Sequence, residues 1–128
     1  MILNNTTFNQ NFMKECCLAH KDLRGMNFSM TQLIGSDLRG VNLDGADLTQ
    51  TNFMEADLSG ETLNNIQGRY AIFMKAKMAK ASLKGASLQQ SCFVEADLTL
   101  GDLSNVDLES SIFKQAVCRG TQFVKSTL

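Results

Sequence analysis

Few residues of this chain could do catalytic chemistry, and none of them forms a reactive pair that the sequence alone identifies. His20 is the only histidine, and no serine or cysteine has a base partner at a spacing typical of nucleophilic catalysis. No spacing typical of zinc ligands connects the four cysteines, Cys16, Cys17, Cys92 and Cys118. A glycine-rich phosphate-binding loop is also absent from the sequence. The sequence therefore predicts a protein that is not an enzyme and that uses no cofactor and no metal.

A large apolar residue recurs at every fifth position along the chain, from Leu3 to Leu128. Leu, Phe or Met fills all of these central positions except two, which hold Gly68 and Cys118. A period of five fits neither the 3.6-residue period of a helix nor the two-residue period of a strand. A fixed internal repeat is instead typical of stacked, solenoid proteins. Because the register never slips, we expect a single domain over residues 1–128.

The other positions of the repeat also have preferences. The residue two before each centre is usually small, and the residue directly before it is often Asp or Asn. Seven of the nine glycines fall two residues after a centre. The clearest copies are residues 46–50 (Ala-Asp-Leu-Thr-Gln) and 56–60 (Ala-Asp-Leu-Ser-Gly).

This pattern resembles the motif of the pentapeptide-repeat family, A-(D/N)-L-x-x, over essentially the whole chain. The resemblance implies an all-β fold, a right-handed quadrilateral β-helix with four pentapeptides in each coil of about 20 residues, hence about six coils. The centre and the small residue would point inward, and the other three residues would point outward. One large and one small residue per side would fill the narrow interior, and glycine would relieve backbone strain at the corners.

In a coil of about 20 residues, residues 20 apart in the sequence form one column of a face. Two such columns place a lysine between two acids, and they read Glu55, Lys75, Glu95 and Asp57, Lys77, Asp97. We expect each lysine to cancel the repulsion between like charges stacked about 4.8 Å apart.

The net charge of −1 conceals bands of charge along the chain. Residues 31–61 carry six acids and one base, residues 62–94 carry five bases and no acid, and residues 95–109 carry five acids and no base. The predicted solenoid is therefore acidic, then basic, then acidic along its axis.

Two neighbouring outward columns are apolar where other outward positions are mostly polar. The candidate partner surface consists of Ile34, Met54, Met74 and Val94 in one column, with Ile72 and Ile112 in the other. A contiguous exposed apolar stripe usually marks an interaction surface. We therefore expect these residues to bind a protein partner whose identity the sequence does not give. The alternative is that a terminal segment or local packing covers them.

Residues 61–70 are the weakest repeats. Glu61 and Ile66 occupy small inward positions, whereas Gly68 occupies a large one. We expect Ile66 to fill the space that Gly68 leaves, and the side that carries Glu61 to bulge outward, because a buried carboxylate is costly. Two interpretations stay open: sequence drift in a robust solenoid, or a protruding recognition element around Arg69 and Tyr70.

Two classes of function fit this sequence. The first is a non-enzymatic scaffold that presents flat β-helix faces to a protein partner. The second is implied by the resemblance: some family members look like duplex DNA, bind type II topoisomerases and protect gyrase from quinolones. Such a mimic needs dense negative charge, so the basic band over residues 62–94 argues against it, whereas the acidic zones favour it. We expect no direct binding of nucleic acid.

The repeat continues in register to Phe123 and Leu128, with no capping helix after them. Exposed solenoid ends are usually covered, and several family members dimerise through their C-terminal coils. We therefore expect a homodimer through residues about 109–128, with both side chains buried between the subunits. No apolar run reaches the length of a transmembrane span, and residues 1–7 lack the pattern of a signal peptide. Cytoplasmic residence with reduced thiols, away from membranes, is the expectation.

Overall fold

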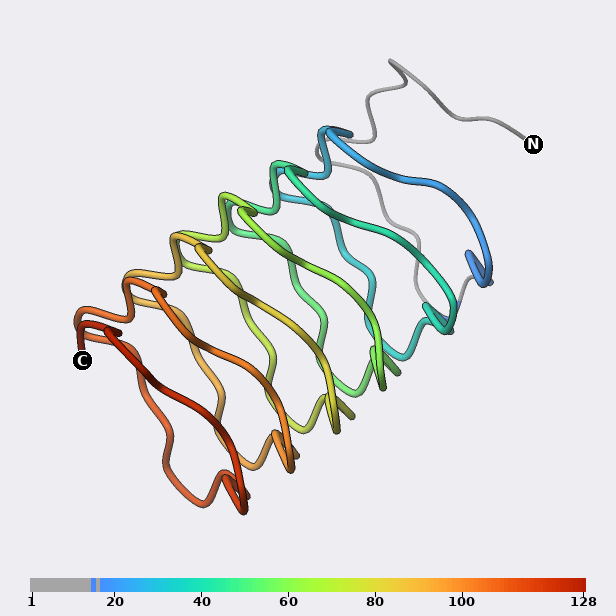
Figure 1. Ribbon diagram of the computed structural model, residues 1–128. Helices are drawn as coiled ribbons and strands as arrows, with labels where there is room; N and C mark the ends of the chain where they lie inside the picture. Colours follow the sequence, from blue (N-terminus) through green and yellow to red (C-terminus); the bar gives the residue numbers. More distant parts are fainter. Residues whose placement is uncertain (1–14, 16) are drawn as a thin grey trace.

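The computed structural model describes residue 15 and residues 17–128, which wind as a solenoid from one end of the molecule to the other (Figure 1). The residue before each centre forms a parallel bridge with the residue 20 positions later, from Cys17 with Asp37 to Asp107 with Thr127. A turn follows every centre, so each coil has four sides. Within the described residues these single bridges take the place of longer strands, and no helix is present. The predicted repeat β-solenoid with a 20-residue period is therefore confirmed.

No helix among the described residues has the length and apolar character needed to cross a membrane.

Each side of a coil is joined to the same side of the adjacent coils by a regular set of backbone hydrogen bonds. The Leu58 N–H donates to the Lys77 carbonyl, and the Gly60 N–H donates to the Ala79 carbonyl, both at 2.8 Å. The Asp57 N–H donates in the opposite direction, to the preceding coil. Because these bonds connect only adjacent coils, the stability of the solenoid depends on contacts between neighbours.

The preference for glycine two residues after a centre has a backbone cause. That residue is the third of a β-turn closed by a hydrogen bond from the next small residue to the centre, as from the Ala56 N–H to the Phe53 carbonyl at 2.9 Å. It has a positive φ at every described corner, for example +74° at Gly60 and +76° at Gly40. Glycine adopts this conformation without the steric cost that other residues bear.

The preference for Asp or Asn directly before the centre also has a structural cause. The N–H of the residue after the centre takes no part in the backbone hydrogen bonds between coils, which we call the backbone ladder. Where Asp or Asn precedes the centre, its side-chain oxygen accepts this N–H instead. Thus the Thr49 N–H donates to Asp47 Oδ1 at 3.0 Å. Where Ser82 occupies this position, the Lys84 N–H instead donates to Asn64 Oδ1 of the preceding coil, also at 3.0 Å. Polar residues at this position therefore stabilise the turns.

The centres and small residues form the core, as predicted. Every centre from Leu18 to Leu108 is buried. The rings of Phe53, Phe73, Phe93 and Phe113 stack nearly parallel, with centroids 4.9 to 5.1 Å apart. Every buried polar side-chain atom in the described part of the chain has a hydrogen-bond partner. Burial of each large centre contributes about 1.5–3 kcal/mol before the entropy of ordering is subtracted.

The exchange of sizes between Ile66 and Gly68 is confirmed. Ile66 is 1% exposed. A Cβ atom added to Gly68 would lie 2.6 Å from Leu88 Cδ2 and 3.5 Å from Ile66 Cδ1. Ile66 and Leu88 therefore occupy the space in which other repeats place their own centre, and a larger residue at position 68 would require the Leu88 side chain to move.

The predicted bulge around Glu61 is wrong, because residues 61–70 keep the register of the solenoid. The Glu61 N–H closes its turn on the Leu58 carbonyl at 3.2 Å, and Thr62 bridges both Asn42 and Ser82. Only the Glu61 side chain turns outward, where its Oε1 accepts a hydrogen bond from the Gly40 N–H at 2.5 Å. A flexible side chain can leave the interior more cheaply than the backbone can.

This contact interrupts the backbone ladder. At the other described corners with a following coil, the equivalent N–H donates to a carbonyl of that coil, but the Gly40 N–H does not bond to Ser59. The neighbouring bridge between Asn42 and Thr62 is kept, so the change is confined to the Gly40 N–H. We call this place the Glu61 corner.

The last coil, residues 109–128, has its inner residues partly open. Phe113 and Phe123 pack against the core, whereas Leu128 is 77% exposed. Cys118 was expected to be buried, but it is exposed because no coil covers it on one side. Cys16 occupies a small inward position of the repeat, two residues before the centre Leu18, and it lies outside the described residues.

Candidate interaction surface

The side chains of the described solenoid that could bind a ligand or partner lie on its outer faces, because the centres and small residues fill the interior. His20 is exposed and its ring covers Gly40, where an added Cβ would lie 2.2 Å from His20 Nδ1. Cys17, Cys92 and Cys118 are free thiols. Among the described residues, no group of three or more His, Cys, Asp or Glu side chains could hold a metal ion.

The structure brings the six residues of the candidate partner surface together. We name them the apolar face: Ile34, Met54, Met74, Val94, Ile72 and Ile112. The Gly35 and Glu55 N–H groups donate to the Met54 and Met74 carbonyls at 2.8 and 3.0 Å, so that column runs through successive coils. The second column is also continuous, because Cys92 bridges both Ile72 and Ile112.

The two columns lie on one side of the solenoid. The residues before and after a centre point to the same side, since the Arg24 guanidinium reaches the Asp22 carboxylate at 2.7 Å around Leu23. By the same geometry, Ile72 and Met74 share a side.

The side chains of the apolar face are more buried than the sequence predicted. Ile112 is 54% exposed, but the other five are only partly exposed. Stacked neighbours along each column shield one another from water, so the face is a low ridge instead of a row of protruding side chains.

A column of alternating charge borders the apolar face. It consists of Glu55, Lys75 and Glu95, with Lys75 Nζ 3.7 Å from Glu95 Oε2. On the next face, Lys77 bridges both Asp57 and Asp97 through its backbone. The predicted placement of each lysine between two acids is confirmed.

Several carboxylates are held in the ionised form by their own turns. The Arg39 guanidinium donates two hydrogen bonds to the Asp37 carboxylate, at 2.9 and 2.8 Å, and the Arg39 N–H donates a third. These bonds lower the pKa of Asp37 to about 2. The hydroxyl of Thr99, at 2.6 Å, similarly lowers the pKa of Asp97. These groups therefore carry full negative charge at neutral pH.

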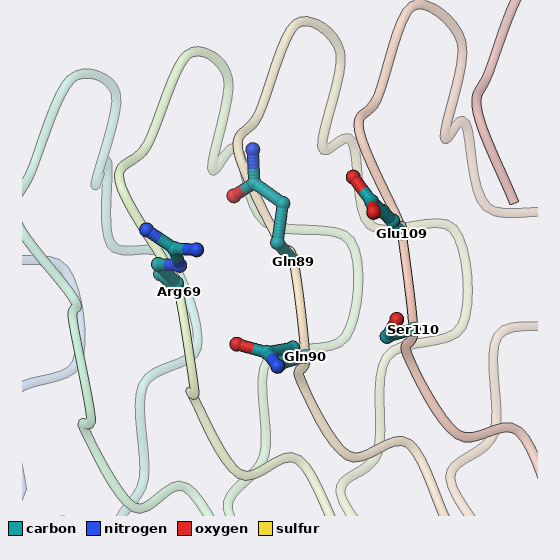
Figure 2. A pocket seen from close by; sticks show the side chains of 5 residues that line it. All are labelled: Arg69, Gln89, Gln90, Glu109 and Ser110. Carbon is teal, nitrogen blue, oxygen red and sulfur yellow. The ribbon is translucent and has the colours of Figure 1, made fainter.

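A shallow polar groove of about 90 Å³ crosses three successive coils on another side (Figure 2). Its lining residues are Arg69, Gln89, Gln90, Glu109 and Ser110. We call it the Arg69 groove. Arg69 and the adjacent Tyr70 are exposed, and the Arg69 Cζ lies 5.5 Å from the centre of the Tyr70 ring.

Sequence reasoning singled out Arg69 and Tyr70 but missed the other lining residues. They could have been found by the 20-residue columns, because Gln89 and Glu109 follow Arg69, and Gln90 and Ser110 follow Tyr70. The two residues do not form a protruding element, because their repeat stays in register with the coils on both sides.

The comparisons with known proteins agree with this architecture. A family model described as pentapeptide repeats matches eight copies, over residues 2–44, 31–66, 51–90 and 65–99. None of the curated proteins matches this chain in sequence.

Solved structures show the same fold. One is HetL, a pentapeptide repeat protein involved in heterocyst differentiation regulation from the cyanobacterium Nostoc sp. strain PCC 7120. The match has 21% identity and a TM-score of 0.64, and it covers 91% of this chain and 63% of HetL. Another is trypsin-treated QnrB1, a plasmid-mediated fluoroquinolone resistance protein, with 20% identity, a TM-score of 0.58, and coverage of 94% and 66%. The chain thus spans less than two thirds of each.

A third similar structure is a pentapeptide repeat protein from the Arabidopsis thaliana thylakoid lumen, with 23% identity and a TM-score of 0.54. That match covers 77% of this chain and 69% of the other. Identities this low establish a shared fold alone. Together with the repeat of five, the 20-residue pairing and the family match, they show that this chain belongs to the pentapeptide-repeat family.

Proposed function

We propose that this protein is a non-enzymatic scaffold that binds a protein partner through its apolar face. The proposal takes the solenoid to be right-handed and to have about six coils, as the family resemblance implies.

One observation carries the proposal. The position after the centre holds a large apolar residue at only five described places, and four of them form a single column: Ile34, Met54, Met74 and Val94. The fifth is Val124, in the last coil. At every other described place this position holds a charged, polar or small residue. Scattered apolar residues on a surface need no explanation, whereas a contiguous group does. Methionine also suits adaptable contacts, because its side chain is unbranched and polarisable.

The test compares two double variants that introduce the same charge in successive coils. Met54→Asp with Met74→Asp places two carboxylates on the apolar face. Ser59→Asp with Ala79→Asp places them at the same repeat position on the next face. Both should fold, as judged by circular dichroism. We expect the first variant to lose partners that the wild-type protein captures, and the second to keep them. Retention of the same partners by the methionine variant would overturn the proposal.

A second candidate function is modulation of a type II topoisomerase by mimicry of DNA. The acidic zones at residues 31–61 and 95–109 favour it, and QnrB1 is described as a fluoroquinolone resistance protein. The bases between these zones argue against it, because Lys75 and Lys77 interrupt the negative columns. Supercoiling by gyrase, measured with and without the protein and a quinolone, distinguishes the two functions. Unchanged supercoiling and unchanged quinolone inhibition would exclude the second.

A further inference from the structure

Arg69 lacks the ion pair that holds two of the other three arginines at its repeat position; Arg119, which has Val117 two residues before it, also lacks one. Arg24 and Arg39 occupy the same repeat position, and each binds the aspartate two residues before it, at 2.7 and 2.8 Å. Arg69 has Gln67 at that place, and no carboxylate within salt-bridge distance among the described residues. Its column neighbours in the coils on either side, Thr49 and Gln89, are uncharged. Its guanidinium donors are therefore available to an external acceptor.

Tyr70 holds this guanidinium in place without using its N–H groups. The ring centroid is 5.5 Å from Arg69 Cζ, a cation–π distance, and Tyr70 is itself 45% exposed. Stacking on an aromatic ring leaves the edges of a guanidinium free for bidentate contact with a carboxylate. Arginine and tyrosine are also among the residues that most often anchor protein interfaces.

The rest of the Arg69 groove adds a second charge and amide groups; the Gln89 amide already donates to Asp107 Oδ2 at 2.7 Å, so Gln90 is the remaining neutral donor. Gln89 and Gln90 follow in the next coil, and Glu109 lies one coil further on (Figure 2). At a coil spacing of about 4.8 Å, Arg69 and Glu109 lie about 10 Å apart. The groove therefore has a cation at one end, an anion at the other and amide groups between. In an extended peptide, side chains two residues apart point to the same face about 6.6 Å apart, so a glutamate and a lysine at that spacing can extend towards Arg69 and Glu109 respectively.

The groove also adjoins the apolar face. Tyr70 is separated from Ile72, a member of that face, by the single buried residue Ala71. A partner that covers Ile72 and Met74 would reach Arg69 around one corner of the solenoid.

We infer that Arg69 and Tyr70 form a carboxylate-binding anchor for an acidic, partly apolar segment of the protein partner. The apolar part of this inference rests on the proposed function, whereas the carboxylate site stands on the Arg69 groove alone.

The arginine Nε–H resonances in an NMR spectrum test the anchor with two defined probes. The first is the blocked peptide Ac-Glu-Leu-Lys-NH2, whose Glu and Lys share one face when extended, and the second is Ac-Gln-Leu-Lys-NH2, which lacks only the carboxylate. We expect the Glu peptide to shift the Arg69 Nε–H resonance in a saturable way and the Gln peptide to leave it unmoved. Arg24 and Arg39 serve as controls in the same spectrum, because their donors are already occupied.

Variants then separate this site from general charge effects. Arg69→Lys should weaken binding of the Glu peptide about threefold, as followed by the backbone amide resonance of Tyr70, because an exposed ion pair loses its bidentate geometry. Arg119→Lys should leave it unchanged, since Arg119 is an exposed arginine in the last coil with no stacked ring. Equal shifts with both peptides, or equal shifts at Arg119 and Arg69, would overturn the inference.

The outcomes also separate the anchor from the proposed function. If the apolar face is not the binding surface, Met54→Asp with Met74→Asp leaves partner capture intact, while the Glu peptide still shifts Arg69. If the anchor is wrong, that double variant loses the partner, while Arg69→Lys keeps it and the two peptides behave alike.

Discussion

At the scale of single residues, the aspartate before each centre has two roles. Asp37 accepts the backbone N–H of its turn and binds the guanidinium of Arg39. The same carboxylate therefore stabilises a turn and fixes a surface charge. Since an aspartate without this turn has a pKa near 3.9, the value of about 2 at Asp37 links folding to pH.

The sign of this link follows from the lowered pKa. A folded-state pKa of about 2 stabilises the fold above about pH 4, and the contribution is lost as the pH falls towards 2. The melting temperature of the wild-type protein should thus fall more steeply over this range than that of Asp37→Asn. The effect should be small, because the pair is exposed to solvent. Arg39→Gln should flatten the profile in the same way, since its guanidinium is the largest cause of the shift. Identical slopes for wild type and Asp37→Asn would contradict this account.

At the scale of the coil, the columns connect residues that are 20 apart in the sequence. Changing Lys75 and Lys77 to glutamate would place three acids in succession in each of two columns. We expect the free energy of unfolding to fall by about 1 kcal/mol at low salt, through repulsion between stacked carboxylates. Salt at about 0.5 M should restore most of the loss, because it screens exposed charges.

The matched control makes the same change in net charge elsewhere. Lys114→Glu with Lys125→Glu alters the last coil, where the preceding residues of the two columns are Val94 and Asn105. This variant should cost less stability than the first. Equal losses would show that net charge, and not column alignment, decides the effect.

Much of this architecture could be predicted from the sequence, because the period of the repeat is strict. The inward positions, the columns through Lys75 and Lys77, and the filling of the Gly68 space by Ile66 all follow from the register. The path of the Glu61 side chain does not, since it depends on the Gly40 amide in the preceding coil. Likewise, the Arg69 groove depends on side-chain conformations in three coils. The repeat fixes the backbone, whereas corner contacts depend on local combinations of residues.

At the scale of the molecule, the last coil is the place where the predicted self-association can be tested. Phe123 packs against the core, and the neighbouring Val124 is 60% exposed. If two copies associate through residues about 109–128, Phe123→Asp should convert a dimer to a monomer in light scattering. Val124→Asp adds the same charge at an outward position and should leave a dimer. A wild-type protein that stays monomeric at high concentration would refute the predicted dimer.

The interrupted ladder at the Glu61 corner has a consequence for how the molecule comes apart. A stack whose layers touch only their neighbours unfolds as one cooperative unit only while every interface is of similar strength. At this interface a side-chain contact replaces one regular backbone bond, and a net hydrogen bond contributes about 1 kcal/mol. We therefore expect the solenoid to open first between the coil that contains Gly40 and the coil that contains Glu61. The backbone amides on the N-terminal side of this interface should exchange hydrogen together, and earlier than the amides on its C-terminal side.

Glu61→Ala should restore the regular backbone bonding at this interface. Alanine is the usual inward residue of the repeat, and Ala81 is buried in the same column of the next coil. The variant should be more stable by about 1 kcal/mol, and hydrogen exchange should become uniform across the corner. Unchanged exchange in the variant would show that the contact between Glu61 and the Gly40 N–H does not weaken this interface. By this account, a single glutamate divides a solenoid of nearly identical coils into two segments that can unfold separately.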